Sequence, residues 1–225
     1  MAVRENAECQ DSVQVAQAAH SARIGAAGSH GHLHLQDLKA VAAGILPRDF
    51  DDLVHMLCNL YGRHPALLDL ALNLCPAGPT HVWLSETANA FERERLYLVR
   101  LTAAVGPLPS TPGSAETEGA LVAARHALET LAKSERCGCA LGAATALISD
   151  WRAIRPLLDR AATRVGIEPP AFALPDEESI AGALADGADS SAAERAIRFG
   201  AEQLLLQHRA MFDLLEARAE AREFI

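Results

Sequence analysis

Residues 191–222, SAAERAIRFGAEQLLLQHRAMFDLLEARAEAR, form the longest uninterrupted helical pattern in the chain. Apolar residues and one histidine recur along the stretch in alternating steps of four and three, at Ile197, Ala201, Leu204, His208, Met211 and Leu215. Such spacing predicts a helix that packs along one seam over its whole length. We therefore interpret the rest of the chain as the helices against which this one packs.

The upstream sequence predicts three more long helices, and its composition agrees with a helical fold. The chain contains 45 alanines but only 18 valines and isoleucines together, and alanine favours helices whereas β-branched residues favour strands. No segment shows the period-2 alternation of a strand. We predict an all-α fold without a β-sheet, an antiparallel bundle of four long helices at about 80–105, 115–135, 139–165 and 191–222. The short connection at 106–114 predicts that the two helices it joins are antiparallel neighbours.

The chain of 225 residues is long enough for one domain. Residues 1–35 are polar with only a weak helical stripe, and we expect a loosely formed helix or a partly disordered segment there. Residues 36–225 are expected to form a single helical-bundle domain, in which short helices precede the four long ones.

The charge balance and the absence of targeting signals limit the possible functions. The net charge is −9 with only 2 lysines, so nucleic-acid binding is not expected. No apolar run reaches the roughly 18 residues of a membrane span, and the N-terminus lacks the apolar core of a signal peptide. The five cysteines are odd in number and irregularly spaced. We expect a cytoplasmic protein with reduced thiols, and the excess of alanine and arginine suggests a bacterial source.

Two ionisable residues, Glu94 and His208, lie on seams that are otherwise apolar. A buried carboxylate must be paired, bound to a metal or neutralised by a raised pKa. One hypothesis is that Glu94 and His208 converge in the bundle and hold a metal ion or a haem. The other is that an arginine pairs with Glu94 and that His208 is a hydrogen-bonded core residue.

The same helices carry aromatic and sulfur-containing side chains that are candidates for an apolar ligand pocket. With Glu94 and His208, these pocket candidates are Phe91, Trp151 and Met211. A di-iron site of the ferritin-like kind is disfavoured, because such sites use Glu-x-x-His pairs and the sequence contains none.

His30, His32 and His34 form an H-x-H-x-H run in a glycine-rich segment. Imidazoles at this spacing can bind Zn²⁺, Ni²⁺ or Cu²⁺. Because we identify no nearby cysteine or acid that would complete a site, we expect adventitious metal binding rather than a dedicated site.

No catalytic motif emerges from the sequence. The favoured hypothesis is a non-catalytic helical-bundle protein that binds a small apolar ligand or a partner helix, with no resident cofactor. A homodimer formed through an alanine-rich helical face is a further expectation. The alternative is a metal- or haem-binding enzyme or sensor that uses Glu94 and His208.

Overall fold

The computed structural model describes residues 2–40, 47–136 and 138–223, and all regular secondary structure within these ranges is helical. The predicted all-α class is therefore confirmed for the described chain. The helices are α1 (Ala2–Ala27), the 3₁₀ turn η1 (Ser29–Gly31), α2 (Leu33–Lys39), α3 (Pro47–Tyr61), α4 (Leu67–Leu74), α5 (Pro79–Val105), α6 (Ser114–Ala132), α7 (Cys139–Val165), α8 (Glu177–Gly187) and α9 (Ser191–Glu223).

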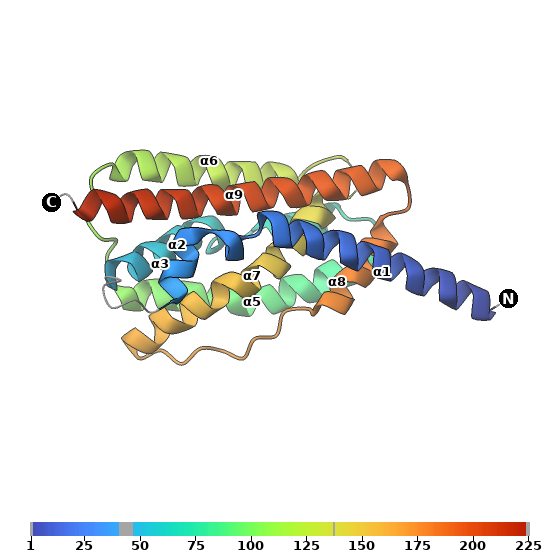
Figure 1. Cartoon of the computed structure of the whole chain (residues 1–225), viewed down its shortest axis with the longest axis horizontal. Coiled ribbons are helices and arrows are strands. Elements are labelled where there is room, and N and C mark those ends of the chain that lie inside the picture. The colour runs from blue at the N-terminus through green and yellow to red at the C-terminus, as the bar shows by residue number, and fades with distance from the viewer. Residues whose placement is uncertain (1, 41–46, 137, 224–225) are drawn as a thin grey trace.

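Helix α7 lies at the centre of the molecule (Figure 1). Every residue from 141 to 150 is buried, so this part of the helix has no solvent-facing side. The helix packs most extensively against α9, and it also contacts α1, α3, α4, α5, α6 and α8. A helix buried on all sides must be almost entirely apolar or small, which is the composition of this segment.

Two glycines permit a very close approach between α7 and α9. A Cβ atom placed on Gly142 would lie 1.9 Å from the carbonyl oxygen of Ile197, and one on Gly200 would lie 2.0 Å from that of Cys139. The two backbones are therefore in direct contact, without side chains between them.

The arrangement differs from a simple bundle of four long helices. Helices α5 and α6 do not pack along each other as the short connection predicts, because α3 and α4 lie between them and contact both. A linker of nine residues can span about 30 Å, more than the 8–10 Å between neighbouring helices, so its length does not require the two helices to be neighbours.

Helix α1 packs on α8 and α9 with its C-terminal half, and its N-terminal end projects beyond the rest of the molecule (Figure 1). His20 and Ser29 are buried against the bundle. The division of the chain at residue 35 stays a prediction.

Each of the described helices is too short or too polar to span a bilayer.

Candidate functional site

Glu94 and His208 are both buried, as their seam positions predict, and the other three pocket candidates from the sequence are buried as well. The exposed fractions of the five side chains are 1% for Glu94, 0% for His208, 4% for Phe91, 0% for Trp151 and 2% for Met211. Three hollows of the described surface are lined by other residues.

The carboxylate of Glu94 is held by two donors from α7. Arg155 Nη1 donates to Oε1 at 2.6 Å, and Trp151 Nε1 donates to Oε2 at 2.9 Å. Burial raises the pKa of Glu94, while the bonds from Trp151 and Arg155 oppose that rise. Arg155 also donates to Asp159 at 2.7 Å. Both oxygens of Glu94 are therefore engaged by protein groups.

His208 lies in the middle of a second buried network. Its Nδ1 is 2.6 Å from Asp150 Oδ2, and its Nε2 is hydrogen-bonded to the hydroxyl of Tyr61. The backbone N–H and the hydroxyl of Ser29 donate to Asp150 at 2.7 and 2.5 Å. Burial acts to raise the pKa of Asp150, but the bonds from His208 and Ser29 lower it overall. With an ionised Asp150 as the acceptor, His208 donates from Nδ1.

The two networks are separated by packed aromatic rings. Tyr61 and Trp151 meet edge to face with centroids 5.6 Å apart, and Phe91 packs on Trp151 at 5.0 Å. Glu94 and His208 have different partners, and no contact joins them. A metal or haem site made from this pair would have to displace Tyr61 or Asp150 from a ring nitrogen of His208 and compete with Arg155 and Trp151 for Glu94, so the geometry disfavours it.

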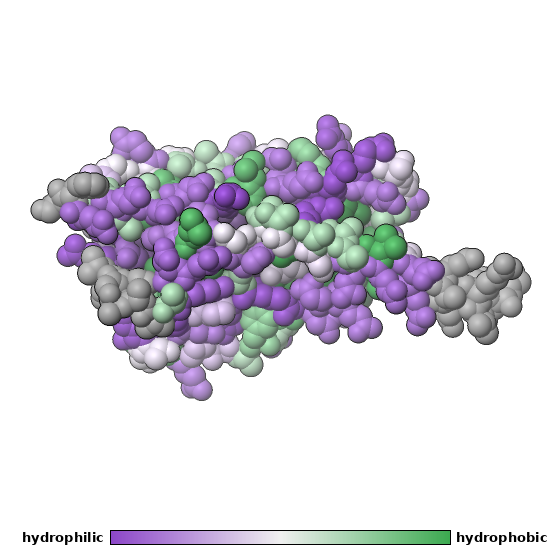
Figure 2. Space-filling model, in the orientation of Figure 1, coloured by the Kyte–Doolittle hydropathy of each residue, from purple (hydrophilic) through white to green (hydrophobic). Residues whose placement is uncertain are grey.

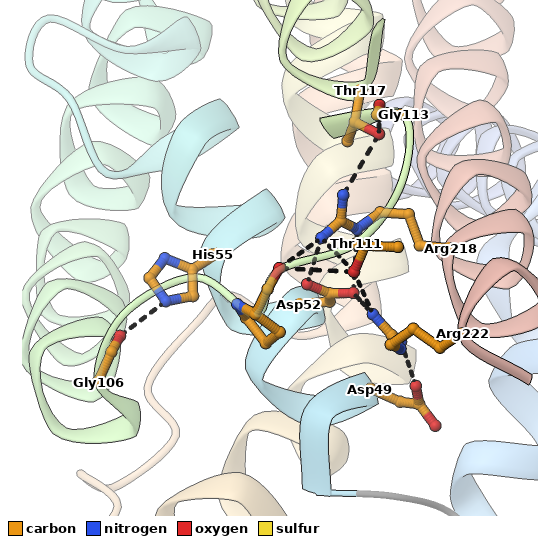
Figure 3. A network of polar contacts seen from close by, with 10 residues as sticks. Asp49, Asp52, His55, Gly106, Thr111, Gly113, Thr117, Arg218 and Arg222 are labelled. Carbon is orange, nitrogen blue, oxygen red and sulfur yellow. Dashed lines mark hydrogen bonds and ion pairs between the residues drawn. The ribbon is translucent and has the colours of Figure 1, made fainter. Parts of the chain in front are cut away.

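A third network, shown in Figure 3, ties the C-terminal end of α9 to α3 and to the connection between α5 and α6. Arg218 donates to both oxygens of Asp52, at 3.0 and 2.9 Å, and to Thr111 at 3.2 Å. Arg222 pairs with Asp49 and Asp52. Arg218 and Asp52 are almost fully buried. The network joins α3, the connection between α5 and α6, and α9. Its arginine and aspartate side chains pair with one another.

An apolar cavity of about 520 Å³ lies between α1, α8 and α9. Small and aliphatic side chains form most of its lining, among them Val15, Ala16, Ala19, Leu184, Ala185 and Ile197. Its volume falls within the range of about 300–1,000 Å³ that is usual for small-molecule sites. Figure 2 shows a row of apolar side chains along α1 on an otherwise mostly hydrophilic face.

Cations outnumber acids at the edge of this cavity. The lining contains three arginines, Arg23, Arg195 and Arg198, and two acids, Asp11 and Glu194. Within the described residues, no hydrogen bond or ion pair joins Arg23 to another side chain. Burial and the neighbouring charge of Arg198 lower the pKa of Arg23, although Glu202 acts in the opposite direction. This partly buried cation would gain from an anion placed in the cavity.

The three histidines of the H-x-H-x-H run have different surroundings. His30 is exposed, His34 is partly buried and His32 is buried. His32 Nε2 lies 2.9 Å from Asp213 of α9, so an acid distant in the sequence lies beside the run. This acid did not enter the sequence-based expectation of adventitious metal binding, which itself stays a prediction.

The sequence matches a family of unknown function, DUF6975, over residues 24–223. The chain belongs to the DUF6975 family. No curated protein and no solved structure matches it. The matched region of this DUF6975 chain contains both core networks and the part of the cavity lining that comes from α8, α9 and the residues between them, but it begins at residue 24, beyond the lining residues of α1.

Several polar residues of this DUF6975 chain were missed in the sequence analysis, although the sequence does contain a signal for two of them. The seam of α9 continues beyond Leu215 by steps of three and four onto Arg218 and Arg222, both of which are bonded to Asp52. Asp150 has no such signal, because the helix around it is buried on every side.

Proposed function

We propose that this protein binds a small apolar molecule that carries an anionic group, in the cavity between α1, α8 and α9. The observation that carries the proposal is the combination of an apolar lining with Arg23 at its edge, which has no hydrogen bond or ion pair to another described side chain. Apolar walls with a few polar groups that fix orientation are the usual composition of ligand sites.

Electrostatics support an anionic ligand over a neutral one. A cation that burial has partly removed from water is stabilised by an opposite charge, and Arg23 has no such partner within hydrogen-bonding distance among the described residues. Arg198 is paired with Glu202 at 3.8 Å, so it competes only weakly for the same anion. A carboxylate on an apolar chain would place its charge beside Arg23 and its chain on the alanines.

Binding without catalysis is supported by the location of the acid and base groups. Glu94, Asp150 and His208 are sealed in the core and have protein partners. A general acid or base must reach the proton that it transfers, directly or through one water. These three groups do not line the cavity.

The test uses 1-anilinonaphthalene-8-sulfonate, which is an apolar anion that fluoresces in dry sites, with decanoate as the competitor. We expect the native protein to enhance the fluorescence and decanoate to reverse it. Ala19→Phe should abolish the signal because it fills the cavity, whereas Ala18→Phe places the same ring on an exposed neighbouring position outside the lining.

Arg23→Gln should weaken dye binding about tenfold, as expected for loss of one charged partner worth about 1.4 kcal/mol. Arg209→Gln on the exposed side of α9 is its control and should bind as the native protein does. Equal binding by the native protein and by Ala19→Phe would refute the proposed site. If Ala19→Phe instead converts a dimer to a monomer, the cavity is a protein interface and the ligand proposal is wrong.

A further inference from the structure

A cluster of one imidazole and two carboxylates joins α2 to the C-terminal half of α9. His32 stands between η1 and α2, is 7% exposed and contacts the ring of Phe212 at a centroid distance of 5.7 Å. Its Nε2 is 2.9 Å from Asp213 Oδ1. Glu216 follows Asp213 by three residues on the same helix, which places both carboxylates on one face.

These three side chains are close enough to share one ion. One possible ligand atom from each of His32, Asp213 and Glu216 lies within 4.8 Å of the other two. Atoms that bind one tetrahedral ion at about 2.0–2.2 Å lie about 3.3–3.6 Å apart, so side-chain rotations that move these atoms by about 1 Å bring them into range.

Among the described residues, no lysine or arginine forms an ion pair with either carboxylate of the cluster. Asp213 has the His32 ring as its partner, and Glu216 has no hydrogen bond or ion pair within the described residues. His34 lies close enough to Glu216 and Asp49 for both acids to affect its ionisation, and its Nε2 is buried without a hydrogen-bond partner among the described residues. A second imidazole therefore lies beside the same acids.

We propose that His32, Asp213 and Glu216 form a binding site for a divalent transition-metal ion of the Zn²⁺ type. An imidazole with carboxylates is the donor set that such ions prefer, whereas Mg²⁺ and Ca²⁺ prefer oxygen ligands alone. Asp213 is mostly exposed, which leaves one side of the ion open to water. The bound ion would fasten α2 to α9.

The metal site is independent of the ligand cavity. Asp213 lies fifteen residues beyond Arg198 on α9, or about 22 Å along the helix axis. Neither site uses a residue of the other. One proposal can therefore fail while the other holds.

The experiment is calorimetric titration of the untagged, chelator-treated protein with Zn²⁺, and with Mg²⁺ for comparison. We expect one Zn²⁺ per chain and no measurable heat from Mg²⁺. Asp213→Asn and Glu216→Gln should each weaken Zn²⁺ binding by more than about 100-fold, because second-shell changes alone cost about 10–100-fold. Glu220→Gln, an exposed acid one turn further along α9, is the matched control and should bind within about twofold of the native protein.

A second variant separates this site from adventitious binding to the histidine run. His30→Gln removes an exposed imidazole that lies outside the cluster, so it should leave Zn²⁺ affinity unchanged. Loss of binding in His30→Gln with full binding in Asp213→Asn would overturn the proposal. Absence of Zn²⁺ binding to the native protein would also overturn the proposal. Thermal unfolding checks that each variant is folded, and Zn²⁺ should raise the Tm only of chains that retain the three ligands.

Discussion

The substitution Gly142→Ala should destabilise the protein strongly, although alanine is the better helix former. Gly142 lies in α7, where an added Cβ would be 1.9 Å from the carbonyl oxygen of Ile197 in α9. Cβ atoms essentially never approach another atom within 3.0 Å, so the two helices must separate by about 1 Å. That separation disturbs the most extensive helix–helix contact in the fold.

The magnitude follows from two opposing effects. Overpacking a core costs about 1–3 kcal/mol, and more when backbone rather than a flexible side chain is in the way. Replacing glycine by alanine inside a helix gains about 1 kcal/mol. We expect a net loss near 2 kcal/mol in the free energy of unfolding, which corresponds to a fall in Tm of about 4–8 °C for a chain of this length.

The assay is urea and thermal unfolding followed by circular dichroism, with Gly119→Ala as the matched control. Gly119 is an exposed glycine inside α6, and nothing lies within 4 Å of its added Cβ. The control should gain up to about 1 kcal/mol from helix propensity alone. If Gly142→Ala is as stable as the native protein, or gains stability as the control does, α7 and α9 are not in backbone contact and the reasoning is refuted.

Two further predictions concern buried polar groups. Burial and Arg23 lower the pKa of His20 to about 4. Below pH 6.5 the unfolded chain therefore binds a proton that the folded chain does not bind. As the pH falls from 6.5 to 4, the free energy of unfolding should decrease by about 3 kcal/mol. Urea unfolding of His20→Gln should show a shallower loss, and an unchanged pH dependence would contradict the shift. Asp52→Ala leaves Arg218 buried without its partner and should cost about 3–5 kcal/mol, whereas Asp51→Ala breaks a more exposed pair and should cost about 1 kcal/mol or less. Equal losses in these two variants would show that the pair with Arg218 is not buried.

The helical fold was predictable because periodicity and composition indicate the same structure. The seam of α9 and the caps and breakers between segments locate the long helices to within about three residues. Which helices pack against each other was harder to predict from the sequence. Nothing in the linker 106–114 indicates that α3 and α4 lie between α5 and α6, because a linker's length limits the distance between helices without fixing which helices are neighbours.

The candidate sites were only partly predictable. Seam positions predict that Glu94 and His208 are buried, yet their partners Arg155 and Asp150 come from α7, whose surroundings are protein on nearly every side. Hydrophobic periodicity shows which residues of a helix face the core only where the opposite face of that helix is solvated. It therefore does not indicate which residues of α7 meet Glu94 and His208.

The ligand cavity and the metal cluster depend on contacts between distant parts of the chain. The cavity requires α1 to pack on α8, and the weak apolar stripe of α1 does not predict that contact. The metal cluster requires His32 to meet Asp213, 181 residues further along the chain.

Titration of ¹⁵N-labelled protein with decanoate, followed by amide chemical shifts, tests the proposed binding site directly. We expect saturable shifts concentrated on α1 and α8 around Ala16, Ala19 and Ala185, and in Arg23→Gln the same shifts should need about tenfold more decanoate to saturate. No shifts, or shifts centred on the aromatic core around Trp151, would contradict it.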